Sequence, residues 1–148
     1  MKKVILAGLT ALALTSAQAA EMTVFGQRDV SSERNGAGFS VGKAFGPVTA
    51  SFGVDKIKFA KQDVDTFWVA GTYDVVRFGK LSANVSGAGA FVRQEHGTNG
   101  YALLTGVGLE YDITKTMSAV VDFRRQFGQD KIKSLDGNVV AAGLRYKF

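Results

Sequence analysis

The sequence predicts an all-β chain that folds as a transmembrane antiparallel up-and-down β-barrel of eight strands. Apolar and polar residues alternate with a period of two, and polar or Gly-containing breaks interrupt this pattern about every ten residues. No mature segment approaches the roughly twenty continuous apolar residues of a spanning helix. The face opposite the apolar one is rich in Gly, Ala and Ser, which suits a narrow barrel interior.

The first twenty residues have the features of a cleaved signal peptide. Lys2 and Lys3 form a basic n-region, a short apolar h-region follows, and residues 17–19 read Ala-Gln-Ala, a small-x-small cleavage site. The apolar run is too short for a retained membrane helix. We therefore expect residues 1–20 to be removed and residues 21–148 to form one outer-membrane barrel domain.

Charge and cysteine content exclude several classes of protein. The formal net charge of the full chain is +5, and removal of Lys2 and Lys3 lowers it to about +3. This mild excess lacks the clustered basic patch that nucleic-acid binding requires, so no nucleic-acid partner is expected. The chain has no cysteine, which excludes disulfides and thiolate metal sites. No cofactor and no metal ligands are predicted.

The first five strands are expected at residues 22–28, 36–45, 48–56, 66–73 and 81–93. The outer face of the first strand stays open, because its even-numbered residues compete with its odd-numbered ones for the lipid side. A slip of one residue reverses such an assignment. In the fourth strand Phe67, Val69 and Tyr73 form the expected lipid face, which turns Trp68 inward as a plug for the lumen.

The last three strands are expected at residues 101–113, 117–127 and 138–148. In the sixth, Tyr101 and Tyr111 lie ten residues apart on one apolar face. At ~3.3 Å per residue and a tilt of about 40°, they span roughly 25 Å, the height of a lipid-facing band. In the seventh, Arg125 interrupts the apolar face near the loop end, where a long side chain can snorkel.

The connections alternate in length. Residues 45–48 and 113–116 form tight turns and residues 74–80 a somewhat longer link, whereas the remaining four connections are polar and mostly longer: 29–35, 57–65, 94–100 and 128–137. Short periplasmic turns opposite longer external loops are typical of outer-membrane barrels. Aromatic residues also gather near the strand ends, as an interfacial girdle requires. The predicted location is the cell outer membrane.

Two stretches of the chain resemble a known family. The ending Gly143-Leu144-Arg145-Tyr146-Lys147-Phe148 resembles the signal that the barrel-assembly machinery recognises, with Leu144, Tyr146 and Phe148 as its apolar residues. Residues 106–119 are similar to a strand–turn–strand hairpin of OmpA-like and OmpX-like eight-stranded barrels.

The resemblance implies a non-enzymatic outer-membrane protein that supports envelope integrity or surface contact, with a closed or narrowly gated lumen. Its implied partners are outer-membrane lipid, lipopolysaccharide and, during biogenesis, the barrel-assembly machinery. A monomer is favoured. OmpA-like proteins often carry a peptidoglycan-binding domain after the barrel, and peptidoglycan tethering is not implied for this chain, which ends with the last strand.

Five charged residues are expected to point into the lumen: Glu110, Asp122, Arg124, Arg145 and Lys147. Since an isolated buried ion is very costly, we expect Glu110 to meet Arg145 or Lys147, and Asp122 to meet Arg124 or a neighbour. Two interpretations remain open. The charges form either a satisfied polar core that seals the lumen, or a gate whose ion pairs rearrange to pass water or ions. A permanently open diffusion pore is not expected, because it needs many more strands.

Two alternative functions have discriminating features. Outer-membrane lipid A deacylases use a Ser–His–acid arrangement on a barrel of this size, so a lipid A-modifying enzyme would need the single histidine, His96, close to a Ser or Thr and an acid. Thr98 stands where their motif has serine, and the stretch resembles a loop tip, so no catalytic residue is assigned. A soluble periplasmic ligand-binding barrel would instead turn the apolar face of residues 101–113 inward.

Lysines of two external loops are candidates for contact with lipopolysaccharide phosphates at the outer rim. The alternative is ordinary solvated loop charge, because several aspartates lie close by in the sequence. The candidate lysines are Lys56, Lys58, Lys61, Lys131 and Lys133, and the offsetting acids are Asp63, Asp65, Asp130 and Asp136.

Overall fold

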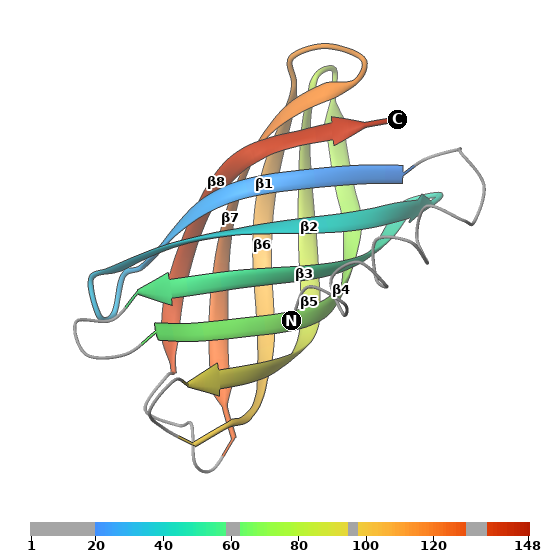
Figure 1. Cartoon of the computed structure of the whole chain (residues 1–148). Helices are drawn as coiled ribbons and strands as arrows, with labels where there is room; N and C mark the ends of the chain where they lie inside the picture. The colour runs from blue at the N-terminus through green and yellow to red at the C-terminus, as the bar shows by residue number, and fades with distance from the viewer. Residues whose placement is uncertain (1–19, 59–62, 95–97, 130–135) are drawn as a thin grey trace.

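The computed structural model describes residues 20–58, 63–94, 98–129 and 136–148. These residues form a closed antiparallel barrel in which each strand pairs with its neighbours in sequence and β1 also pairs with β8 (Figure 1). The strands are β1 (Ala20–Asp29), β2 (Arg34–Phe45), β3 (Val48–Lys58), β4 (Asp63–Phe78), β5 (Leu81–Gln94), β6 (Gly100–Asp112), β7 (Met117–Gly128) and β8 (Gly137–Lys147). No helix among the described residues is long and apolar enough to cross a membrane.

The two ends of the barrel differ in their connections. The turns at residues 46–47, 79–80 and 113–116 lie at one end, here called the turn end, together with Ala20 and Phe148. Gly46 and Gly79 have φ of 64° and 59°, a region that favours glycine, and so allow the two tightest turns. The other four connections lie at the opposite end, here called the loop end, which corresponds to the external side of an outer-membrane barrel.

The register of the strands fixes the tilt and the width of the barrel. Starting at Ala20, each residue can be followed to its paired residue on the next strand, once around the barrel. This row comes back to the first strand's side at Val30, ten residues after Ala20 in the sequence. For eight strands this offset gives a tilt of roughly 40° and a radius of ~8 Å. The members of the row are Ala20, Lys43, Ala50, Gly71, Gly87, Thr105, Arg125 and Asn138.

The apolar faces of the strands point outward. On β6, the outward-facing Tyr101 and Leu103 are 65% and 52% exposed, whereas the inward-facing Leu104 is 8% exposed. This orientation is that of a membrane barrel, not of a soluble ligand-binding one. On β1 it is Met22 and Val24 that face outward. The structure thereby resolves the assignment that the sequence left open for this strand.

Six of the eight strands extend further than the sequence indicates, β6 and β8 are displaced by one residue, and β4 differs most. Its alternation breaks at a bulge between Asp74 and Val76, which places Val75 and Val76 together on the outer wall. The bulge turns Arg77 into the lumen, where the register pairs it with inward-facing Ser82. The expected long link at residues 74–80 is therefore only a two-residue turn, because the bulge lets β4 and β5 continue to pair.

Candidate functional site in the barrel lumen

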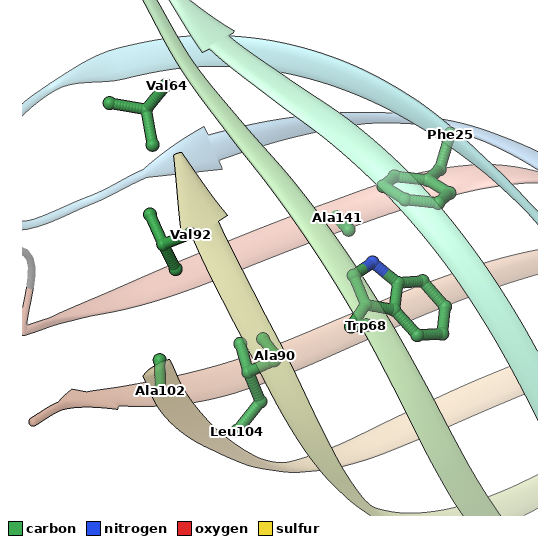
Figure 2. Packing of buried hydrophobic residues seen from close by; sticks show 8 residues of the cluster. All are labelled: Phe25, Val64, Trp68, Ala90, Val92, Ala102, Leu104 and Ala141. Carbon is green, nitrogen blue, oxygen red and sulfur yellow. The ribbon is translucent and has the colours of Figure 1, made fainter. Parts of the chain in front are cut away.

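The middle of the lumen is crossed by two aromatic side chains. Phe25 on β1 and Trp68 on β4 both point into the interior, and their ring centroids are 6.5 Å apart (Figure 2). Both side chains have glycines as cross-strand partners, so the rings can lie against bare backbone. A Cβ at Gly53 would overlap the Trp68 ring, and a Cβ at Gly38 or Gly143 would overlap Phe25.

Charged and polar groups complete this layer. The Arg124 guanidinium lies 5.2 Å from the Phe25 ring centroid and 5.4 Å from that of Trp68, within cation–π range. Trp68 Nε1 donates a hydrogen bond to Asp55 Oδ2 at 3.0 Å. Gln27 Nε2 donates another to Asp55 Oδ1 at 2.9 Å. We call Phe25, Trp68, Arg124, Asp55 and Gln27 the aromatic septum.

On the loop side of the septum the lumen is filled by apolar side chains. Val92 is fully buried, and Val64 and Ala102 are 3% and 6% exposed. Figure 2 shows these residues beside Ala90 and Leu104, between the strand ends and the aromatic rings. These apolar side chains pack together with the two rings of the septum in the loop-side half of the lumen.

On the turn side lies a cluster of ion pairs. Glu110 is 5% exposed and contacts two cations: Arg145 Nη1 lies 2.6 Å from its Oε2, and Lys147 Nζ lies 2.5 Å from its Oε1. Arg145 Nε also lies 3.4 Å from Glu21 Oε1, and Lys147 Nζ lies 3.0 Å from Asp112 Oδ1. We call Glu21, Glu110, Asp112, Arg145 and Lys147 the ion-pair cluster. Arg77 joins it through a hydrogen bond to Asp112.

Between the septum and the ion-pair cluster is a small polar cavity of about 50 Å³. Its lining includes the hydroxyls of Thr23, Ser40 and Ser86, and its volume suffices for only a few water molecules. A wider hollow of about 230 Å³ opens at the turn end beyond Glu110 and Arg145. The lumen is therefore a wide entrance, an ion-pair cluster, a small polar cavity and an aromatic septum in series.

The residues expected in the lumen all lie there. Arg124 Nη2 is 3.2 Å from Asp122 Oδ2, whereas Glu110, Arg145 and Lys147 belong to the separate ion-pair cluster. The five expected charges thus form two groups, not one. Sequence reasoning missed Asp55 and Glu21, which a firm face assignment for β1 and β3 would have placed in the lumen.

Several predicted features lie outside the described residues. These are residues 1–19 of the predicted signal peptide, His96, Lys61, Lys131 and Lys133, whereas Ala20, the expected last residue of that peptide, is the first residue of β1. Of the other candidate lysines, Lys56 Nζ is 2.5 Å from Asp63 Oδ2, so it already has a carboxylate partner, and Lys58 is the last residue of β3. Within the described part of the chain, no three His, Asp or Glu side chains are grouped as a metal site would require.

Solved structures with the same fold are barrels of transmembrane proteins. The crystal structure of Neisserial surface protein A is 12% identical to this chain, with a TM-score of 0.67 over 87% of this chain and 94% of that one. A de novo designed transmembrane β-barrel is 14% identical, with a TM-score of 0.60 over 90% and 98%. At these identities the likeness shows the fold alone. Comparison with curated proteins finds no match.

A family model gives the assignment. The model of the Gram-negative porins matches residues 9–148, nearly the whole chain. Together with the outward apolar wall and the closed eight-stranded register, this match places the protein in the outer membrane. The chain belongs to the Gram-negative porin family.

Proposed function

We propose that this porin-family barrel is a closed, non-enzymatic outer-membrane protein that supports envelope integrity or surface contact, in the manner of OmpA-like and OmpX-like barrels. The observation that supports the proposal is the dense side-chain filling of the lumen. The aromatic septum, the apolar cluster beyond it and the ion-pair cluster leave a cavity of only about 50 Å³ between them. Porins that conduct freely have about 16–18 strands.

Bilayer conductance tests the closed lumen. The refolded mature chain should show no stable conductance step in a planar lipid bilayer. The double variant Phe25→Ala, Trp68→Ala removes both rings that cross the lumen, and it should conduct measurably more than the wild type. A variant with two rings removed from the outer wall, Phe91→Ala with Phe123→Ala, serves as the control. Stable open channels in the wild type would contradict the proposal.

A narrowly gated lumen is the second candidate. It is favoured by the cations of the ion-pair cluster, each of which contacts two carboxylates. Arg145 contacts both Glu21 and Glu110, and Lys147 contacts both Glu110 and Asp112, so either cation can leave one carboxylate while keeping another. If the pairs rearrange, the wild type should show rare brief openings, and Asp112→Asn should change their frequency. Identical silent recordings from both proteins would exclude a gate at this cluster.

The supporting role in the envelope is tested in cells. A host strain that lacks the chain should become more sensitive to detergents and to large antibiotics, and the wild-type chain should restore resistance. The same assay addresses the enzymatic alternative. His96→Ala should restore resistance as well as the wild type, and the lipid A mass spectrum should be unchanged in the strain without the chain. A changed lipid A mass would point to the enzyme instead.

A further inference from the structure

Charged side chains on the outer wall are few and unevenly distributed. The only acids among the described outward-facing strand residues are Asp63 and Asp65, both at the loop end of β4. Each has a cation partner: Lys56 Nζ lies 2.5 Å from Asp63, and Arg93 Nη2 lies 2.8 Å from Asp65. With the exposed Lys58, this rim has three cations and two acids, so its net charge is about +1 and two of its cations are paired with acids.

The wall over β7, β8 and β1 carries cations without acids. Arg28 and Arg125 are exposed, and among the residues that the structure describes neither guanidinium has a carboxylate within ion-pair distance. Arg125 Nη1 donates a hydrogen bond to Asn138 Oδ1 at 3.1 Å, and its guanidinium lies 5.6 Å from the Phe127 ring centroid. These contacts orient Arg125 and leave most of its five donors available.

The register places both arginines at one height. Each strand-to-strand step along a row rises by roughly 3 Å, and each residue along a strand by about 2.5 Å. Arg125 is six steps along the row from Ala20, and Arg28 is eight residues along β1 from the same residue. Both therefore lie roughly 20 Å above Ala20, and their Cα atoms are ~12 Å apart along the wall.

Tyrosines mark the two edges of the apolar wall. By the same geometry Tyr111 and Tyr146 lie close to the height of Ala20, and Tyr101 lies roughly 25 Å above it. Arg28 and Arg125 are thus about 6 Å below the upper tyrosine edge of the apolar wall. At that edge the hydrocarbon of the bilayer gives way to headgroups. A cation at this depth is stabilised only if an anion or water reaches it.

We infer that Arg28 and Arg125 form a binding site for the phosphates of lipopolysaccharide in the external leaflet. The guanidinium presents two parallel N–H groups that match phosphate oxygens, and its neighbours on this wall, Asn138 and Val140, bring no competing acid. The site deepens the proposed function, on which it rests, because a barrel that holds its surrounding lipid anchors the leaflet. It differs from the lysine contacts expected from the sequence.

Lipopolysaccharide retention tests the site. The folded mature chain in detergent is titrated with purified lipopolysaccharide, and bound molecules are counted by native mass spectrometry. The double variant Arg28→Gln, Arg125→Gln should bind roughly 30-fold more weakly, and added salt should weaken wild-type binding. The control Lys43→Gln removes an outward cation at the turn end, which lies over Phe45, and should bind as the wild type does. A heat-modifiable band confirms that each variant is folded.

Two further ligands identify the source of the phosphate. Enzymatically dephosphorylated lipopolysaccharide should bind the wild type and the double variant equally weakly, and phosphatidylglycerol should bind more weakly than lipopolysaccharide. Unchanged affinity of the double variant would overturn the inference and leave the arginines as cations that simply reach water. Equal wild-type affinity for the dephosphorylated lipid would overturn it too. None of these outcomes bears on conductance, so the closed lumen is tested separately.

Discussion

At the scale of single residues, glycines decide where large side chains fit inside the lumen. Trp68 lies over Gly53 on β3, and Phe25 lies between Gly38 and Gly143 on the strands at either side. A radius of ~8 Å leaves no room for two large side chains opposite each other on adjacent strands. Large residues in this lumen therefore require bare backbone beside them.

We predict that Gly53→Val destabilises the barrel by about 1–3 kcal/mol, because its side chain would overlap the Trp68 ring. The matched control is Gly87→Val, at an outward position where an added Cβ meets nothing within 4 Å. Urea unfolding followed by gel mobility measures both, and Trp68 fluorescence should shift only in Gly53→Val. Equal stability of the two variants would contradict the described packing.

The ion-pair cluster supports a second prediction at this scale. Glu110 is buried between Arg145 and Lys147, so Glu110→Gln leaves two cations without their shared partner. Because each cation keeps a second carboxylate, the expected cost is about 1–3 kcal/mol in urea unfolding. Asp65→Asn breaks a pair with the half-exposed Arg93 at the rim and should cost less than about 1 kcal/mol. The cluster would not be structurally important if both variants unfolded alike.

At the scale of elements, the bulge in β4 keeps apolar residues on the outer wall and polar residues in the lumen up to the end of the strand. Val75 is the extra residue, since Asp74 pairs with Asn84 while Val76 pairs with the very next residue, Ala83. Asp74 and Arg77 are three positions apart, so strict alternation would place them on opposite faces of the strand. The extra residue at the bulge lets both side chains face the lumen. It therefore delivers Arg77 to the ion-pair cluster.

Single-residue deletions test the bulge. Deletion of Val75 removes the extra residue and leaves a regular strand, so the chain should still give a heat-modifiable folded band. Deletion of Val69 reverses the faces of the residues that follow it, which turns Asp74 to lipid and Tyr73 into the lumen, and should abolish that band. If the Val75 deletion fails to fold and the Val69 deletion folds, the register of β4 is wrong.

At the scale of the whole molecule, closure and tilt set how the protein sits in a bilayer. Pairing of β1 with β8 leaves no open edge, so every strand's backbone groups are satisfied within hydrocarbon. One circuit of the barrel along paired residues ends ten residues further along β1, and this offset sets how steeply each row of paired residues climbs. It therefore sets which outward residues share a depth, including the aromatic edges and the two arginines.

The apolar wall predicts a dependence on bilayer thickness. Its tyrosine edges are roughly 25 Å apart, so folding into phosphatidylcholine vesicles should be most efficient when the hydrocarbon core is near that thickness. Acyl chains of graded length provide the series, and gel mobility measures the folded fraction. A yield that rises steadily with thickness, without an optimum, would show that the wall is taller than its register indicates.

Much of the fold was accessible from sequence because a β-strand has a short, strict period. Alternation along residues 101–113 identified the outer face of β6, and it turned Trp68 inward on β4. The first strand was ambiguous, because Phe25 is a large apolar residue that faces the lumen. The bulge in β4 was missed for a related reason: Val75 and Val76 look alike, and the extra residue is defined only by its pairing partners.

By itself, the sequence determined the class of barrel, the number of strands, most of the membrane-facing wall and the five lumen charges, because these follow from local alternation and turn residues. Only the tertiary structure decided which charges meet and at what depth each residue lies. Both depend on the register between strands that are distant in sequence, and each step around the tilted barrel adds to the height. Arg28 and Arg125 are ninety-seven positions apart in the chain, yet they share one level on the wall.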